Sequence, residues 1–288
     1  MKMIYIFTRL PNAYAPKRML EEIQAMGHAG KIIDYLDVTF DISEGKELKV
    51  FNRNNPLSLP DAVIFRAPGV DGFCGAVRDA LLFWLSENGV RVLNKETFSN
   101  WSTWDKLTQH LLMQKAGVAF VNSFVFTDPE RVSIDASEYP VIVKSYLGSH
   151  GDGVKKIASE LELLSLSKSD SPFLKQPFLP GGKDVRVIVL GGKALGAMQR
   201  IAKDGNYLTN YSAGGDVELF DLTQNKEVEE IAIKAASVAR CEYSGVDLMQ
   251  DASGDWKVLE VNRSCQFEGF EQATGDNVAS KIISYLLN

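Results

Sequence analysis

The feature that most constrains this chain is a pair of short apolar segments that flank a polar turn near the C-terminus. Residues 245–248 read Gly-Val-Asp-Leu, residues 258–262 read Val-Leu-Glu-Val-Asn, and residues 250–255 between them are polar and contain a glycine. Two apolar runs separated by such a turn predict a β-hairpin. The end of the chain is therefore expected to contain a pair of antiparallel strands.

Alternation along the second strand of this hairpin separates an apolar face from a polar one. Because successive side chains of a strand point to opposite faces, Leu259 and Val261 are expected to face a core, and Glu260 and Asn262 the other side. Asp247 on the facing strand joins the polar side. Two carboxylates and an amide oxygen are ligands that suit Mg²⁺. The competing interpretation is a hairpin with a solvated polar face.

Composition narrows the class of protein. The chain has 288 residues, enough for two or three small domains, with 45% hydrophobic and 24% charged residues and a net charge of −6. This charge argues against a general nucleic-acid-binding protein, which is normally basic. The N-terminus has no signal-peptide pattern, and no run reaches the roughly 18 apolar residues of a membrane helix. The three cysteines lack metal-type spacing, so we expect a cytoplasmic protein that neither enters a membrane nor binds nucleic acid.

Strands and helices alternate through the first third of the chain. Strands are expected at 3–7, 31–35, 62–65 and 90–93, and helices at 16–26 and 76–87, with a loop or edge hairpin around 52–56. Such alternation predicts a doubly wound parallel sheet over residues 1–95. The glycine-rich dinucleotide turn is missing after the first strand, so this region is not expected to bind a nucleotide.

The rest of the chain predicts antiparallel α+β subdomains. A helix is expected at 104–115, strands at 121–126, 139–144 and 173–179, a hairpin at 185–199, a helix at 226–240 and a last helix at 277–287. We place the boundaries at 96–180 for a central subdomain and at 181–288 for a C-terminal subdomain with the metal site. The expected fold class is thus α/β followed by α+β.

A glycine-rich loop follows one of these strands. Residues 148–154 contain three glycines, which allow the backbone to approach an anion and direct N–H groups at phosphate oxygens. The loop lacks the Walker A pattern, and by itself an ordinary turn is the alternative. Lys144, at the end of the preceding strand, favours the phosphate interpretation, because a lysine there is costly to bury unless it meets an anion. Arg186 and Arg200, on the following hairpin, add planar donor groups for phosphate or carboxylate oxygens.

These motifs occur in the order found in ATP-grasp ligases, and the chain resembles the RimK-like branch, which contains ribosomal-protein glutamate ligase and amino-group-carrier ligases. The resemblance extends over nearly the whole chain. It implies an N-terminal pre-ATP-grasp domain followed by a two-subdomain ATP-grasp fold, with ATP and two Mg²⁺ ions, or Mn²⁺, as cofactors. Ligases of this family are often homo-oligomers, but nothing in this sequence specifies an interface.

The resemblance implies a role for each matching residue. ATP would be bound by Lys106, Lys144, Gly148, Ser149, His150, Gly151, Gly153, Gln176, Pro177, Phe178, Leu179, Asp184 and Arg186. Within this set Gln176 to Leu179 would read the adenine edge and Asp184 would hold the ribose. Asp247, Glu260 and Asn262 would bind the metal ions. Arg200, Asn210 and Lys144 would be catalytic.

Three positions depart from the glutamate-ligase branch. Leu208 and Ala213 stand where that branch carries arginines, and Arg263 begins a segment where it carries small residues and Pro-Gly. These departures concern the acceptor side of the site, so they affect substrate identity more than ATP use. Arg263 is interpreted either as a clamp for a substrate carboxylate or as an exposed structural residue.

The function expected from these observations is an ATP-dependent carboxylate–amine ligase. It would form an amide bond through an acyl phosphate, adding glutamate or a similar amino acid to a peptide, protein or small-molecule acceptor. The alternatives within the fold are an amino-group-carrier ligase and a peptide macrocyclase. The alternative outside enzymes is a nucleotide-binding regulatory protein.

Overall fold

The computed structural model describes residues 1–66, 72–132, 134–146, 153–166, 172–179, 181–203 and 215–288. The chain divides into two compact units. Unit 1 comprises Met1–Thr103, Arg240–Ser244 and Arg263–Asn288, and unit 2 comprises Trp104–Ala239 and Gly245–Asn262. The last helices therefore belong with the N-terminal part of the chain, whereas the boundaries drawn from the sequence placed 181–288 in one subdomain.

Unit 1 is built on a parallel sheet, as the alternation of strands and helices predicted. Its four strands lie in the order β2-β1-β6-β7 and all pair in parallel. Their bounds are β1 (Met3–Thr8), β2 (Ala29–Asp34), β6 (Ala62–Phe65) and β7 (Arg91–Val92). Apolar side chains from both faces of β1 and β6 are buried, which explains why these strands read as continuous apolar runs rather than alternating ones.

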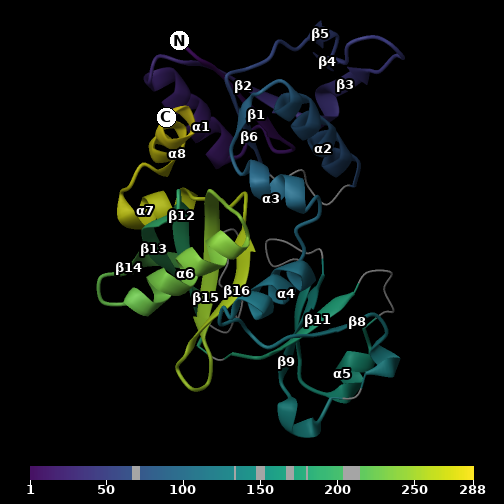
Figure 1. The fold of residues 1–288 in the computed structure, drawn as a ribbon. Helices are drawn as coiled ribbons and strands as arrows, with labels where there is room; N and C mark the ends of the chain where they lie inside the picture. The colour runs from purple at the N-terminus through teal and green to yellow at the C-terminus, as the bar shows by residue number, and fades with distance from the viewer. Residues whose placement is uncertain (67–71, 133, 147–152, 167–171, 180, 204–214) are drawn as a thin grey trace. The chain divides into compact units, whose positions relative to one another are not determined.

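The helices of unit 1 pack on this sheet and on each other. They are α1 (Tyr14–Ala25), α2 (Gly72–Glu87), α3 (Lys95–Asn100), α7 (Glu268–Thr274) and α8 (Val278–Leu287). Although they come from opposite ends of the chain, α1 and α8 lie side by side (Figure 1). Asn277, which caps α8, donates from Nδ2 to Glu22 on α1 at 2.9 Å. This contact joins the two ends of the chain within one unit.

The weakly patterned stretch after β2 folds into a small antiparallel sheet. A 3₁₀ turn, η1 (Tyr35–Asp37), leads into β3 (Val38–Asp41), β4 (Lys49–Asn52) and β5 (Asn55–Pro56). The expected loop or edge hairpin is thus a three-stranded element.

Unit 2 contains two sheets. The first is antiparallel in the order β10-β9-β11-β8, with β8 (Phe124–Phe126), β9 (Val141–Ser145), β10 (Val154–Ile157) and β11 (Phe173–Pro177). One face is covered by η2 (Pro129–Arg131), η3 (Ala136–Glu138) and α5 (Glu160–Leu164), around the buried side chains of Val141, Val143 and Leu163. The strand expected at 121–126 is shorter because the N–H of Val121 bonds to the carbonyl of Val258 instead, at 3.1 Å.

The second sheet has the order β14-β13-β12-β15-β16. Its strands are β12 (Lys183–Leu190), β13 (Lys193–Ile201), β14 (Asp216–Phe220), β15 (Tyr243–Gln250) and β16 (Trp256–Asn262), and the helices packed on it are α4 (Lys106–Ala116) and α6 (Lys226–Val238). The predicted hairpin turns at Gly191 and Gly192, both at positive φ, where a side chain would be strained. Among the described residues, no helix has the length and apolar character needed to cross a bilayer.

Candidate active site

The hairpin predicted at the end of the chain is present, with one difference in register. Asp247 on β15 pairs with Glu260 on β16, and the next pair is Leu248 with Val258, so Leu259 forms a bulge. Val258 and Val261 are therefore the buried residues, at 0% and 1% exposure, and Leu259 is only half-buried. The expectation that Leu259 shares the core face with Val261 was wrong, because a bulge adds one residue and breaks the alternation.

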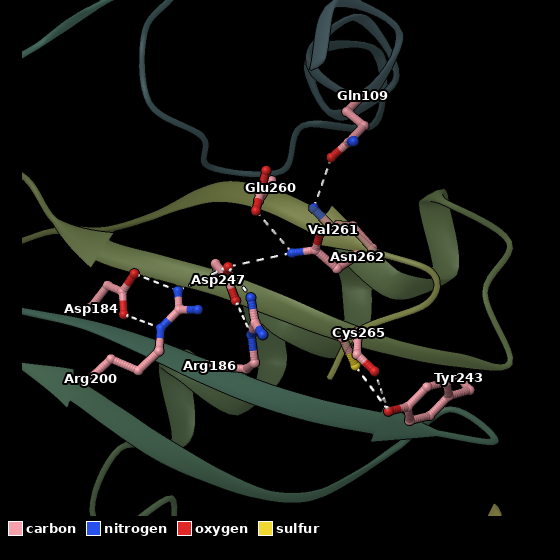
Figure 2. Close-up of polar contacts among 10 residues, drawn as sticks. All are labelled: Gln109, Asp184, Arg186, Arg200, Tyr243, Asp247, Glu260, Val261, Asn262 and Cys265. Carbon is pink, nitrogen blue, oxygen red and sulfur yellow. Dashed lines mark hydrogen bonds and ion pairs between the residues drawn. The ribbon is translucent and has the colours of Figure 1, made fainter. Parts of the chain in front are cut away.

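The three predicted metal ligands do come together (Figure 2). Asn262 donates from Nδ2 to Glu260 Oε1 at 3.0 Å and to Asp247 Oδ2 at 3.4 Å. Two carboxylates and an amide thus converge from neighbouring strands. Among the described residues, at this site and at every other, no group of three His, Cys, Asp or Glu side chains could hold a metal ion. The donors of this trio nevertheless fit Mg²⁺, which takes hard oxygen ligands and few protein side chains.

Asp247 is also held by two arginines. Arg186 donates from Nε to Oδ1 and from Nη2 to Oδ2, both at 2.7 Å, and Arg200 Nη2 lies 2.9 Å from Oδ2. Burial alone would raise the pKa of Asp247, but the two guanidinium groups hold it below its ordinary value. The carboxylate is therefore charged at neutral pH although it is only 2% exposed.

Asp184 is the second acceptor for Arg200. Arg200 donates from Nε to Oδ1 at 2.6 Å and from Nη2 to Oδ2 at 2.5 Å, and the two residues are register partners on β12 and β13. Burial lowers the pKa of Arg200, but Asp184 and Asp247 outweigh it and raise the pKa. Both oxygens of Asp184 thus accept from Arg200, and the expected ribose contact stays a prediction.

Helix α4 fixes the strand that carries Glu260 and Asn262. The N–H of Val261, the residue between them, donates to Gln109 Oε1 at 2.8 Å (Figure 2), and its carbonyl accepts from Trp104 Nε1 at 2.7 Å. The sequence indicated no role at this site for Trp104 or Gln109, because both bonds join segments more than 150 residues apart in sequence. They fix the backbone of Val261, which lies between the predicted metal ligands Glu260 and Asn262.

Lys106 begins α4 and faces the same site. Asp105 caps the helix, accepting from the N–H of Thr108 at 2.7 Å and from its hydroxyl at 2.8 Å. This cap sets where the helix starts and so places Lys106 Nζ 4.0 Å from Glu260 Oε2. An aspartate directly before the first helical residue is a local signal of a helix start, and the sequence contains it.

Lys144 lies on β9, on the face that β9 shares with Leu174 and Gln176 of β11. Burial lowers its pKa, Glu260 opposes this shift, and Lys106 adds to it. Glu260, Asp184 and Asp247 all act electrostatically on this lysine, and Lys106 of α4 lies 4.0 Å from Glu260, so Lys144 of the first sheet, Lys106 and the carboxylates of the second sheet belong to one site. That site lies within unit 2.

His110, which the sequence assigned no functional role, is 5% exposed and borders this site. Its Nε2 lies 3.4 Å from the carbonyl of Leu259, and its ring packs against Phe120 with centroids 5.1 Å apart. Burial lowers its pKa to about 4, and Lys144 and Lys106 act in the same direction. His110 is therefore a neutral imidazole that packs beside the bulge at Leu259, which is a structural role.

The segment predicted to read adenine begins at the end of β11. Gln176 is 2% exposed and donates from Nε2 to Ser123 Oγ at 2.9 Å, and Phe178 N–H bonds to the carbonyl of Pro140 at 3.4 Å. Pro177 is exposed, and Phe178 and Leu179 are half-buried. Lys156 Nζ lies 4.0 Å from the centroid of the Phe178 ring.

Several predicted residues lie outside the described part of the chain. These are Gly148, Ser149, His150, Gly151 and Asn210, together with the departures Leu208 and Ala213. Gly153, a described glycine of the glycine-rich loop, has φ +76°, and a Cβ there would lie 3.1 Å from the Ser145 Cβ. Glycine is therefore required at that position, where its carbonyl accepts from Ser145 at 3.2 Å.

Arg263 is neither exposed nor free to clamp a substrate. It is 8% exposed, and its guanidinium donates to the carbonyls of Trp101 at 2.6 Å and Ser102 at 2.9 Å and stacks 4.4 Å from the centre of the Phe98 ring. Burial, with Arg78 nearby, lowers its pKa to about 9. Both interpretations of Arg263 drawn from the sequence are replaced by a buried structural role inside unit 1.

Lys144 on one sheet of unit 2, Lys106 at the start of α4 and an Asp/Glu/Asn set on the other sheet are the arrangement expected of an ATP-grasp enzyme. The chain belongs to the RimK-like ATP-grasp family, since residues 103–286 match the RimK-like ATP-grasp domain and residues 1–96 match the RimK PreATP-grasp domain. It is therefore an ATP-dependent ligase that forms amide bonds, and ATP-grasp ligases bind ATP and Mg²⁺.

Several known proteins are similar to this chain over nearly its whole length. The probable alpha-L-glutamate ligase of Psychromonas ingrahamii is 31% identical over 98% of this chain and 94% of its own length. Among solved structures, the ATP-grasp ligase PsnB, complexed with a phosphomimetic variant of its minimal precursor, Mg and ADP, has a TM-score of 0.77 at 23% identity and covers 99% of this chain and 97% of its own. The macrocyclase MdnC from Microcystis aeruginosa, bound to the precursor peptide MdnA, has a TM-score of 0.71 at 16% identity and covers 99% of both chains.

Proposed function

We propose that this ligase adds glutamate, or a similar amino acid, to a peptide, protein or small-molecule acceptor through an acyl phosphate. The observation that carries the proposal is the convergence of Asp247, Glu260 and Asn262 opposite Lys106 and Lys144. The choice of glutamate rests on the Psychromonas relative, which carries the name of a glutamate ligase.

The chemistry proceeds in two displacements. An acceptor carboxylate is a poor acyl donor because its leaving group would be oxide. Its oxygen attacks the γ-phosphorus of ATP, the bond to the β-phosphate oxygen breaks, and ADP leaves as an acyl phosphate forms. The amine nitrogen then attacks the acyl carbon, inorganic phosphate leaves with the bonding electrons, and the amine loses a proton to solvent. Such phosphoryl transfer depends on positioning and charge neutralisation.

The described residues supply both the positioning and the charge neutralisation. Lys106 and Lys144 neutralise phosphate charge, and the segment from Gln176 to Leu179 receives the adenine. Asp247, Glu260 and Asn262 would hold two Mg²⁺ ions, or Mn²⁺, which when bound supply Lewis acidity and orientation at the phosphates.

Arg186 and Arg200 keep Asp247 ionised within the fold. Asn210 and the glycine-rich loop with Gly148, Ser149, His150 and Gly151 remain predicted phosphate and intermediate contacts.

A macrocyclase or an amino-group-carrier ligase is the second candidate function. The similarity to MdnC, a macrocyclase with the same fold, favours a macrocyclase over an amino-group-carrier ligase. The reactions share the acyl phosphate and differ in where the attacking amine comes from. In a macrocyclase the amine belongs to the acceptor itself, whereas in the proposed reaction it is a separate amino acid.

The test is phosphate release from ATP and Mg²⁺ with each amino acid in turn, with and without candidate acceptors. We expect release that depends on glutamate and falls at least about a hundredfold in Glu260→Gln, because that variant loses a negative charge where the metal ions bind. Glu230→Gln, on the exposed face of α6, is the matched control and should leave release unchanged. Release driven by a peptide alone would favour a macrocyclase, and ATP binding without release under every condition would contradict the proposal.

A further inference from the structure

Lys156 lies on the same face of the first sheet of unit 2 as Lys144. It pairs with Ile142 of β9, and Ile142 pairs in turn with Gln176 of β11. Residues directly opposite each other on paired strands share one face of a sheet, so these three side chains form a row across β10, β9 and β11. The sequence indicated no role for Lys156, because the short edge strand that carries it has little apolar pattern.

The strand register separates this row from the row that contains Lys144. Lys144 pairs with Val154 on β10 and with Leu174 on β11. Two residues along a strand correspond to about 7 Å, so the row of Lys156 and Gln176 is displaced by that distance from the row of Lys144. Gln176 begins the segment proposed to receive the adenine, whereas Lys144 is proposed to neutralise phosphate charge. Lys156 therefore lies in the row of the base segment and not in the row of the phosphate-binding lysine.

The ammonium of Lys156 packs on the ring of Phe178. Its Nζ lies 4.0 Å from the ring centroid, inside the roughly 6 Å at which a cation is attracted to an aromatic face. Phe178 follows β11, and its N–H donates to the carbonyl of Pro140, the residue before β9, at 3.4 Å. The ring reaches one strand further, to β10. The backbone bond and the ring contact together fix the direction in which the chain leaves β11.

We propose that Lys156 is a positioning residue for the nucleotide base, acting through the ring of Phe178. The ammonium holds the ring in one orientation, and the ring holds the backbone of Phe178 and Leu179 where the adenine edge would bind. Without the ammonium, ordering of this segment is left to ATP binding itself, which lowers the affinity. The inference rests on the nucleotide site proposed above and is independent of the acceptor and the amine.

The first test compares two ligands of the intact protein with Mg²⁺ present: ATP, and inorganic tripolyphosphate, which has the phosphates but no base. Lys156 is exposed, so Lys156→Met should fold. We expect this variant to raise the dissociation constant of ATP about fivefold in titration calorimetry, as for loss of a cation–π contact near the surface, and to leave that of tripolyphosphate unchanged. Equal losses for both ligands would make Lys156 a phosphate-binding lysine, and no loss for either would leave it without a role; each result overturns the proposal.

Two further variants separate the ring contact from charge on the strand. Lys156→Arg should keep the affinity for ATP within about twofold of the wild type, because a guanidinium also stacks on an aromatic face. Lys155→Met is the matched control, since Lys155 is an exposed lysine of the same strand that pairs with Val143 and points to the other face. A loss of ATP affinity in Lys155→Met as large as that in Lys156→Met would show a general charge effect and contradict the proposal.

A double-mutant cycle tests whether Lys156 acts through Phe178. Phe178→Leu removes the ring, so adding Lys156→Met should have no further effect, and the double variant should bind ATP as Phe178→Leu does. Losses that add would show that the two residues act independently, and would refute the proposed route. These affinities involve neither amine nor acceptor, so a protein that meets these expectations but releases no phosphate with glutamate would contradict the proposed function and support the role of Lys156.

Discussion

Arg200 and Asp184 form a buried ion pair with two parallel hydrogen bonds, and the residues are 3% and 4% exposed. Because they are register partners on β12 and β13, the pairing of the strands itself sets their geometry. Arg200 also reaches Asp247, 2.9 Å away. Asp247, one of the predicted metal ligands, is thus connected through Arg200 to Asp184, a second carboxylate that lies on a different strand.

Asp184→Asn should destabilise the fold more than it weakens ATP binding. Removing one charge of a buried pair leaves the other uncompensated, so we expect the free energy of unfolding in urea to fall by about 3 kcal/mol. Asp255→Asn is the control, since Asp255 pairs with Lys257 at the surface and is 66% exposed, where such pairs contribute little. If Asp184 instead acts by holding the ribose, the KM for ATP would rise while stability stayed the same.

Lys144→Met should weaken ATP binding without unfolding the protein. Loss of a charge-assisted contact to phosphate is expected to raise the KM for ATP by about tenfold to a hundredfold. Lys175→Met is the matched variant, because Lys175 lies on the opposite face of the same sheet and pairs with Glu138 at 2.6 Å. Equal effects of the two changes on KM would show that Lys144 does not face the nucleotide.

Arg263→Lys should reduce stability and leave substrate affinity unchanged. A lysine keeps the charge but cannot donate to several carbonyls at once or stack on Phe98, so the free energy of unfolding should fall by about 2–4 kcal/mol. Steady-state kinetics on the folded variant should give the wild-type KM for the acceptor. A large rise in that KM with normal stability would restore the substrate-clamp interpretation.

His110 should make the folded state sensitive to mild acid. Burial lowers its pKa to about 4 in the folded protein, while in the unfolded chain it stays near its ordinary 6.5. Above pH 6.5 neither state binds the proton. Between pH 6.5 and 4 only the unfolded chain does, so stability should fall by about 3 kcal/mol across that range. Urea unfolding at a series of pH values should show this loss in the wild type and a smaller one in His110→Gln; identical pH profiles would refute it.

Most strands and helices were predictable because their signals are local. The continuous apolar runs of β1 and β6 and the glycine pair that separates β12 from β13 all fall within short windows of sequence. So do the glycine at the end of α4 and the polar turn before β16. The edge strands β10 and β14 were missed, since they expose polar residues such as Lys155 and Glu218 and carry little apolar pattern. The bulge at Leu259 could not be read either, because a bulge is a property of two paired strands and not of one.

By itself, the sequence determined which residue types make up the site: two lysines, two arginines, two aspartates, a glutamate and an asparagine, in a fixed order along the chain. The tertiary structure decided which of these groups pair with one another. It paired Arg200 with Asp184, directed Arg186 at Asp247, bonded Val261 to Gln109 on α4, and buried Arg263 under Phe98 in unit 1. Each of these contacts joins residues distant in the chain, and an ion pair or hydrogen bond depends on separation in space, which spacing along a sequence does not contain.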